Sequence, residues 1–470
     1  MKRLQECLNS IDRESLPQSW ETTGDVVKQE HAHFQKLISQ PSSLIYGANT
    51  LVGHKDKTKL TASDFLDFSY DLLSSHMLGG EPWYSPYAAK CISYTKVYSL
   101  SNGGSGISPQ LYNIILECVS DPSFSPQIPQ NCTYSSGDVI PGAHWANAVF
   151  QYAHAKYSYD PMPGEAMALL NGSYIHLGYS ISLLKKLENL WVLFVETTKL
   201  NSRLTGANKS NFYDRYFSSE DGLDAIHYIS NYLKSDYSDY KRQDPISIRS
   251  SPFLIRTLTN SISQLYREID YLLGQPSGNP LFDLDIDYPI SQGSFLAPSL
   301  SIKTEAVIES ILFVMWACVS RTSYLLSGEV AKIPSDASNP SSRLQFIQYP
   351  KLMLSILDKC RQDYGRRIFS SGSQTSKGIE DLWTYGVNVS SQLEDLYADG
   401  IKLFAIELYV LVRCMQIFEI GDYEFEGVWA CAQQQKGLMD IVDELSSHVE
   451  EKGSLGQVRE LFLRGVGIQL

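Results

Sequence analysis

Long segments with helical periodicity constrain the fold of this chain more than any other feature of its sequence. Apolar residues recur near a 3.6-residue period in a series of segments, several of them longer than 20 residues, namely 64–78, 112–119, 166–190, 253–273, 304–326, 349–364, 391–417 and 426–448. Strand-like alternation with hairpin turns is scarce. The sequence therefore predicts an all-α protein built on long packed helices.

The length of the chain and its connecting segments predict how these helices are organised. A single core seldom grows beyond about 250 to 300 residues, so a chain of 470 residues predicts two structural regions. Segments rich in Gly, Pro and Ser separate the helical patterns at residues 99–108, 122–141, 274–301 and 334–342. Long irregular loops inside a helical protein are often functional, which directs attention to these connectors.

Charge and cysteine usage exclude several classes of function. The net charge of -13, without a long Lys/Arg run, argues against nucleic-acid binding. The most apolar stretch, residues 307–326, is interrupted by Glu309 and Arg321 and indicates a buried helix rather than a membrane span. The opening segment is charged and lacks the apolar core of a secretory signal, which predicts a cytoplasmic protein. Eight scattered cysteines never form a CxxC pair, so no metal site is expected.

Residues 134–141, with the sequence YSSGDVIP, contain a tripeptide that can supply unusual chemistry. Taken alone, this small and turn-prone stretch is typical of a surface turn. If the turn is compressed, the Gly137 nitrogen can reach the Ser135 carbonyl carbon, because glycine lacks the Cβ that would block the approach. Loss of water closes a five-membered ring, and loss of the Ser136 hydroxyl as a second water leaves an exocyclic methylidene. Proteins have few electrophiles of this kind.

Nine segments, including this one, match one known family in the right order. Residues 46–53 resemble its YGxNTGFG loop, and the others are similar in turn to SHAAGxG (75–80), LAxGxSG (100–106), ASGDLxP (135–141), EGLALxNG (165–172), QDxYSxR (243–249), NPLx (279–282), GNF (293–295) and QED (378–381). On these motifs the chain resembles a divergent, histidine ammonia-lyase-like member of the aromatic amino acid ammonia-lyase and 2,3-aminomutase superfamily.

The resemblance implies a fold, a cofactor and an assembly. It implies the all-α, fumarase/aspartase-like ammonia-lyase fold with a central bundle of long helices. Residues 1–195 would form the domain that bears the electrophile, and residues 196–470 the long-helix domain. The cofactor would be 4-methylideneimidazol-5-one (MIO), formed by the chain itself from residues 135–137 and followed by Asp138, with no external cofactor. The assembly would be a homotetramer whose active sites draw residues from different subunits.

The resemblance also implies roles in binding and proton transfer. Tyr46 would be the general base, or the acid that returns a proton, with a pKa lowered by hydrogen bonds. Arg249 would clamp the substrate carboxylate in bidentate fashion. Asn171 and Asn279 would donate hydrogen bonds to that carboxylate or to the ring oxygen, and Phe295 would line the ring. Without the family context, these residues are typical of packing, a salt bridge, helix caps and turns.

The substrate is indicated by two further positions. In the family, as the resemblance has it, a Ser-His pair at the end of the helix and a late glutamate accompany histidine as substrate. This chain has Ser75-His76 and Glu380, which favours a small-molecule amino acid whose side chain can hydrogen-bond or carry charge over one with a plain phenyl ring. A histidine at a helix C-terminus can also simply meet the negative end of the helix dipole.

Departures from the family pattern leave the reaction open. Ile246 stands where the family has the tyrosine of YSxR and makes the expected site more apolar. Leu382 replaces a histidine, Lys96 stands near a usual arginine, and residues 50–53 depart from TGFG. Ser135 replaces an alanine, which should matter least because its side chain only decorates the ring. The chain is expected to be a lyase acting on a substrate other than plain histidine, a 2,3-aminomutase, or an inactive assembly protein with this fold.

Overall fold

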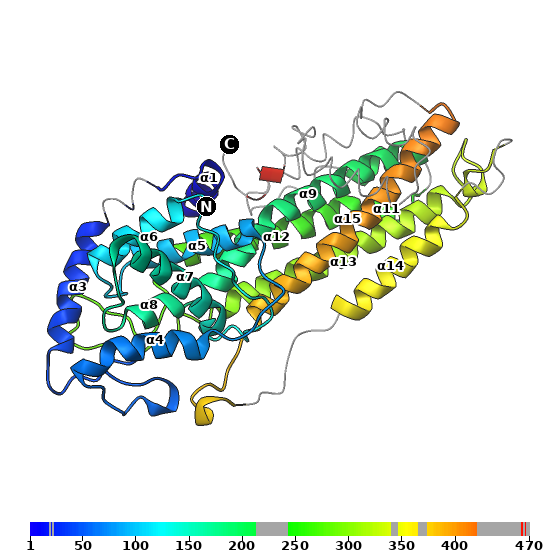
Figure 1. Ribbon diagram of the computed structural model, residues 1–470. Coiled ribbons are helices and arrows are strands. Elements are labelled where there is room, and N and C mark those ends of the chain that lie inside the picture. The colour runs from blue at the N-terminus through cyan, green and yellow to red at the C-terminus, as the bar shows by residue number, and fades with distance from the viewer. Residues whose placement is uncertain are drawn as a thin grey trace. The chain divides into compact units, whose positions relative to one another are not determined.

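The computed structural model describes residues 1–17, 20, 23–212, 243–339, 346–364, 374–420, 462–463 and 466. Its α-helices are α1 (Lys2–Arg13), α3 (Gly24–Ile38), α4 (Phe65–His76), α5 (Pro86–Ser101), α6 (Pro109–Ser120), α7 (Val139–Tyr157), α8 (Glu165–Leu170), α9 (Tyr174–Thr205), α11 (Ile246–Arg249), α12 (Ser251–Leu273), α13 (Pro298–Leu325), α14 (Tyr349–Tyr364) and α15 (Gly386–Ile417). Short 3-10 turns are η1 (Gly53–Lys55), η2 (Ala62–Asp64), η3 (Lys209–Phe212), η5 (Ser335–Ala337) and η6 (Ser376–Gly378). In these ranges, extended pairing is limited to isolated bridges, so the predicted all-α class is confirmed (Figure 1).

The helical patterns correspond to helices with one correction. The segment 166–190 was expected to be a single helix, but it is divided between α8 and α9. The break falls at Asn171-Gly172-Ser173, where Gly172 has φ 143°, a conformation that glycine adopts readily and other residues avoid. The pattern at 426–448 lies outside the described residues. Periodicity alone did not reveal the break because both halves are apolar.

Helix starts follow local signals in the sequence. Ser85 accepts a hydrogen bond from the Ala88 amide and Pro86 is the first residue of α5. Ser108 and Pro109 repeat this arrangement at the start of α6. A serine cap satisfies one of the unpaired amides of the first turn, and proline lacks an amide there in any case. These local pairs fix where the helices begin.

The chain contacts divide the protein into two compact units. The first contains Met1–Leu183, Tyr266–Ile302 and Ile368–Ser391, and the second contains Leu184–Leu265, Lys303–Arg367 and Gln392–Leu470. These units are groups of contacting residues. The domain division expected from the sequence, 1–195 and 196–470, remains a prediction. Two late segments of the sequence thus belong to the same unit as the tripeptide.

Helices α4, α7 and α8 pack against one another in the first unit, as Figure 1 shows. The Trp145 indole on α7 is fully buried and donates to the Ser93 hydroxyl on α5 at 2.9 Å. This packing fixes α7, whose first residue, Val139, is separated from the candidate tripeptide only by Asp138.

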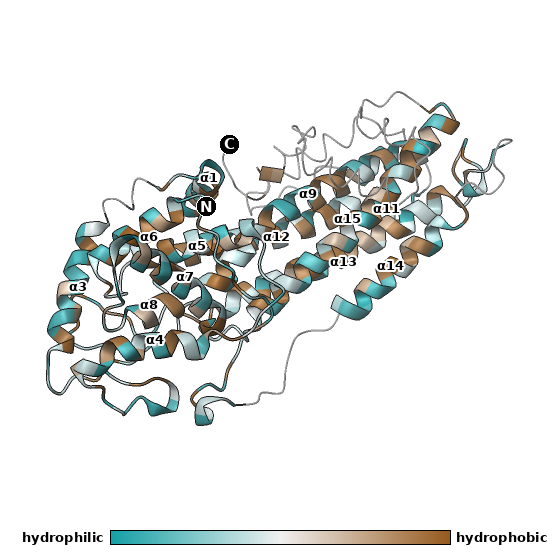
Figure 2. Cartoon of the chain, in the orientation of Figure 1, coloured by the Kyte–Doolittle hydropathy of each residue, from teal (hydrophilic) through white to brown (hydrophobic). Residues whose placement is uncertain are grey.

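Four long helices contact one another in the second unit. The Trp191 indole of α9 donates to the Thr259 hydroxyl of α12 at 2.9 Å, and Arg321 of α13 donates to both carboxylate oxygens of Glu407 on α15 at 2.6 Å. Arg321 is 1% exposed, so the arginine that interrupts the apolar stretch lies inside the protein. Each long helix carries both apolar and hydrophilic residues (Figure 2), and no helix in the described ranges is sufficiently long and apolar to cross a membrane.

Candidate active site

The tripeptide lies in a backbone conformation that few sequences adopt. Ser135 has φ 58°, Gly137 has φ 82° and Asp138 has φ 46°. A residue with a Cβ pays about 1–2 kcal/mol for the left-handed region, so the surrounding contacts must hold Ser135 and Asp138 there. Both are buried, with 2% and 1% of their surface exposed, and Ser136 between them is partly exposed.

Backbone amides from the starts of two helices hold the buried side chains of this loop. The Val387 amide, in the first turn of α15, donates to the Ser135 hydroxyl at 2.9 Å. The His176 amide, in the first turn of α9, donates to the Asp138 carboxylate at 3.2 Å. Amides in the first turn of a helix have no partner within the helix, so these side chains cap α15 and α9 across the fold.

The first residue of the triad therefore does more than the sequence indicated. The Ser135 side chain was expected only to decorate the ring, but its hydroxyl accepts from Val387 and also contacts the Asp138 carboxylate. An alanine, as in the family pattern, would leave the Val387 amide without this partner. Ser135 is thus a structural link between the tripeptide and α15.

Burial dominates the acidity of Asp138. The Thr133 hydroxyl donates to one carboxylate oxygen at 2.9 Å and the His176 amide to the other. Burial raises the pKa of Asp138 to about 6 although these hydrogen bonds favour the charged form and lower it. An acid in this range can hold or release a proton close to neutral pH.

Gly137 lies against two residues that the motifs singled out. A Cβ on Gly137 would lie 2.8 Å from Nδ2 of Asn171 and 3.6 Å from Cδ2 of Phe295. The Gly137 carbonyl oxygen accepts a hydrogen bond from the Gly172 amide at 3.0 Å. The structure therefore brings Asn171 and Phe295 to the tripeptide, and a Cβ at position 137 would force the Asn171 amide to shift.

A buried lysine positions Asn171. The Lys96 ammonium on α5 donates to the Ala168 carbonyl at 2.6 Å and to the Asn171 carbonyl at 3.0 Å, and it lies 4.4 Å from the centre of the Tyr174 ring. Burial lowers the pKa of Lys96 to about 7, because its contacts are carbonyls and a ring rather than a carboxylate. The departure from the usual arginine therefore places a titratable group beneath the site.

The pKa of Tyr46 is shifted in the direction opposite to the one expected. Its phenol oxygen accepts one hydrogen bond, from the Gly53 amide at 2.9 Å. Burial raises the pKa of Tyr46, and the charges of Glu380 and Asp56 raise it further. The expectation of a lowered pKa was wrong because one hydrogen bond does not compensate for lost hydration and two nearby carboxylates.

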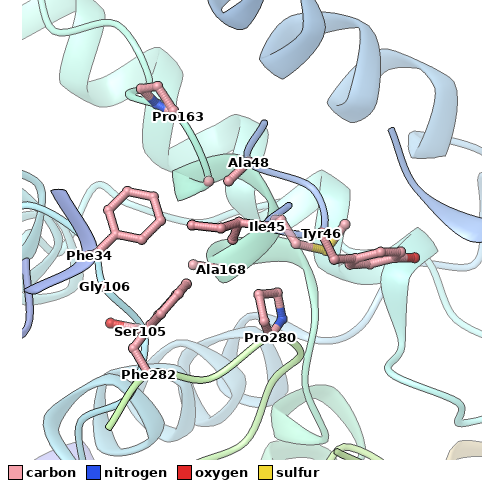
Figure 3. A pocket seen from close by; sticks show the side chains of 12 residues that line it. Phe34, Ile45, Tyr46, Ala48, Ser105, Gly106, Pro163, Ala168, Pro280 and Phe282 are labelled. Atoms are coloured by element: carbon pink, nitrogen blue, oxygen red, sulfur yellow. The ribbon is translucent and has the colours of Figure 1, made fainter. Parts of the chain in front are cut away.

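The loop that carries Tyr46 rests on an apolar cluster. Phe34, Leu37, Ile45, Ala48 and Phe282 form this cluster, and all of them except Leu37 line a cavity of about 10 Å³, room for about one water molecule. Figure 3 shows the Tyr46 ring pointing away from Phe34 and Phe282. The cavity is too small for an amino acid, so its lining supports the loop and leaves the phenol free for another task.

Comparison with known proteins gives a consistent result. The family model described as aromatic amino acid lyase matches residues 13–428. This chain belongs to the aromatic amino acid lyase family. A histidine ammonia-lyase of Photobacterium profundum is 22% identical over 433 residues, covering 85% of this chain and 82% of that protein. Family membership makes the chain an enzyme of the carbon–nitrogen lyase or aminomutase type.

Solved structures share the fold of this lyase family member. The tyrosine aminomutase of Streptomyces globisporus superposes with a TM-score of 0.83 at 14% identity, covering 99% of this chain and 98% of that one. The histidine ammonia-lyase of Trypanosoma cruzi superposes with a TM-score of 0.77 at 15% identity, covering 97% and 93%. At these identities the likeness concerns the fold, and the all-α ammonia-lyase fold is confirmed.

The other predicted site residues lie at a helix end and in loops. His76 closes α4, and its Nδ1 lies 2.7 Å from the Leu72 carbonyl oxygen and 3.1 Å from the Ser75 hydroxyl. Asn279 accepts from the Gln292 amide at 3.3 Å. Glu380 is exposed and accepts a hydrogen bond from the Thr375 hydroxyl. Among the described residues, the hydrogen bonds of these three side chains go to groups outside the tripeptide, and the local interactions of His76 and Asn279 are those of helix-end and turn residues.

Arg249 and Ile246 belong to the second unit. Both lie on the short helix α11. The Arg249 guanidinium is exposed and donates to the Gln243 side chain at 3.1 Å. Ile246 is 69% exposed. The other N–H groups of the Arg249 guanidinium are therefore available to a further hydrogen-bond acceptor.

The motifs did not reveal Thr384 or Val387. Thr384 donates to the Ser135 carbonyl oxygen at 3.1 Å, and Val387 donates to the Ser135 hydroxyl. Both follow the motif at 378–381 by a few residues, and no rule of spacing links them to a tripeptide about 250 residues earlier. Among the residues that the structure describes, no cluster of His, Cys, Asp and Glu is suited to a metal ion.

Proposed function

We propose that residues 135–137 close into MIO and that the enzyme eliminates ammonia from an α-amino acid with a polar or aromatic side chain other than plain histidine. The observation that carries this proposal is that Gly137 packs beside Asn171 and Phe295, in a buried loop whose residues have positive φ angles. The residues present fit the group: the nitrogen that must close the ring belongs to a glycine, and a Cβ there would lie 2.8 Å from the Asn171 amide nitrogen.

The side chains around the tripeptide support a division of roles. MIO, once formed, supplies an electrophile for the substrate amine. Asn171 directs its amide Nδ2 at the tripeptide and donates to the ring oxygen or to the substrate carboxylate. The exposed Arg249 guanidinium is suited to a bidentate grip on that carboxylate.

Tyr46 is better suited to one of its two candidate roles. Its raised pKa keeps the phenol protonated at neutral pH, which suits Tyr46 to give a proton to the amino group that leaves. The elimination also releases a β-proton, and Tyr46 can accept it once its own proton has gone to that amino group. Glu380 is the charged group that acts most on Tyr46 among its neighbours, so it helps to keep the phenol in its protonated form.

The choice of substrate rests on residues outside the tripeptide. His76 and Glu380 supply hydrogen-bonding groups for a polar side chain, whereas Ile246 supplies an apolar surface in place of a tyrosine hydroxyl. A 2,3-aminomutase is the second candidate, since it shares the elimination and differs in whether ammonia adds back before release. We further propose a cytoplasmic homotetramer with active sites shared between subunits.

Intact-mass measurement tests the cofactor. The purified protein is expected to be lighter than its sequence by two waters, and Ser136→Ala is expected to have the full mass. A wild-type protein of full mass would contradict the proposal and would favour an assembly protein that keeps only the fold.

Turnover of a panel of α-amino acids tests the reaction. Ammonia without the β-amino acid identifies a lyase, and the β-amino acid identifies an aminomutase. Turnover of histidine comparable to that of other substrates would contradict the role given to Ile246. Mixing and reassembling Tyr46→Phe and Ser136→Ala proteins tests shared sites, because activity returns only if one site takes these residues from different subunits.

A further inference from the structure

The segment 383–387 closes over the first residue of the tripeptide. The Tyr385 amide donates to the Tyr134 carbonyl at 3.0 Å, the Thr384 hydroxyl to the Ser135 carbonyl at 3.1 Å, and the Val387 amide to the Ser135 hydroxyl at 2.9 Å. The Tyr134 ring lies 5.5 Å from the Trp383 ring and 5.9 Å from the Tyr385 ring. Main chain, side chain and aromatic contacts thus fix the Ser135 carbonyl from one side.

The Thr384 hydroxyl has two acceptors and a single proton. Besides the Ser135 carbonyl oxygen, it lies 3.2 Å from the Leu296 carbonyl oxygen. Leu296 follows Phe295, whose ring lies beside Gly137. The hydroxyl can therefore rotate to donate to either carbonyl oxygen, and it keeps a hydrogen-bond partner in both orientations.

We propose that Thr384 is a positioning residue for ring closure: its hydroxyl orients and polarises the Ser135 carbonyl that the Gly137 nitrogen attacks. This inference rests on the proposed formation of MIO. When the Ser135 oxygen leaves, the hydroxyl donates to the Leu296 carbonyl instead, so both the open and the closed state satisfy it.

The step that Thr384 assists is the loss of the first water. The Gly137 nitrogen forms a bond to the Ser135 carbonyl carbon, and the π electron pair of the carbonyl moves to oxygen. That oxygen leaves as water with the amide protons of Gly137 and Ser136, and a double bond forms between the carbon and the Ser136 nitrogen. A donor aimed at an oxygen that gains charge stabilises such a step. The second water, from the Ser136 hydroxyl and its Cα hydrogen, does not involve Thr384.

The experiment follows maturation of the full-length protein after a pulse of cell-free synthesis. Intact mass gives the fraction of chains that have lost two waters at each time. Thr384→Val removes the hydroxyl at nearly constant shape and is expected to slow maturation by about a hundredfold, whereas Thr384→Ser restores it. Thr95→Val is the matched control, because the buried Thr95 hydroxyl bonds only within its own helix, to the Cys91 carbonyl at 2.7 Å.

A second measurement separates this role from a merely structural one. Thr384 acts before turnover, so the matured fraction of Thr384→Val is expected to have the wild-type kcat per ring. Maturation of Thr384→Val at the wild-type rate would overturn the inference while leaving MIO formation intact. Slow maturation that Thr384→Ser does not restore, or a lowered kcat per ring, would also overturn it. A wild-type chain that never loses water would instead remove the proposed function itself.

Discussion

Replacing Lys96 with methionine should change how the stability of the protein depends on pH. Burial lowers the pKa of this ammonium from about 10.5 to about 7. Between these pH values the unfolded chain binds a proton at Lys96 that the folded chain does not bind. The free energy of unfolding therefore rises with pH in this window. Below pH 7 the folded state bears the full cost of burying the charged Lys96 ammonium.

The size of the effect follows from this interval. One proton bound only by the unfolded state changes the free energy of unfolding by about 1.4 kcal/mol per pH unit. Because the folded group is half protonated at pH 7, the gain between pH 7 and pH 9 is about 2 kcal/mol. Lys96→Met also removes the donors to the Ala168 and Asn171 carbonyls, but this loss is the same at every pH.

Urea unfolding of wild type and Lys96→Met at pH 7 and pH 9 measures the effect. The difference in unfolding free energy between the two proteins should shift by about 2 kcal/mol in favour of wild type at the higher pH. Lys96→Arg is the control, because a guanidinium stays protonated throughout this range and shows no such shift. An equal difference at both pH values would refute a desolvated ammonium beneath Asn171.

Three further substitutions test the site. Asn171→Ala removes the amide beside the tripeptide and should lower kcat/KM by about a hundredfold in steady-state assays while intact mass still shows the loss of two waters. Tyr46→Phe should lower kcat by about 10²–10⁴, with an unchanged circular dichroism spectrum, because the phenol accepts only the Gly53 amide. Ser135→Ala should lower the unfolding free energy by about 1 kcal/mol, seen in urea titration, because Val387 loses its cap; an unchanged stability would argue against that contact.

Local features of the sequence predicted the helices and the tripeptide, but not what holds the tripeptide. The Ser-Pro pairs 85–86 and 108–109 mark the starts of α5 and α6. The motifs also indicated that Asn171 lies near the tripeptide, and it lies beside Gly137. The contacts of Ser135 with residues 384 and 387 span about 250 residues and leave no local signature in a single sequence. For the same reason, the raised pKa of Tyr46 was missed, since burial and the charge of Glu380 depend on packing.

A helical scaffold suits this tripeptide because helix starts provide amides without partners. α7 begins at Val139, directly after Asp138, while α9 and α15 direct the His176 and Val387 amides at the loop. The positive ends of helix dipoles favour negative charge, and the His176 amide donates to the Asp138 carboxylate while the Val387 amide donates to the Ser135 hydroxyl. Burial nevertheless raises the pKa of Asp138 to about 6, so these dipoles do not fully compensate for lost hydration. The loop thus combines backbone amides that hold its side chains with an acid that can still carry a proton, a combination that a water-exposed turn of the same sequence would lose.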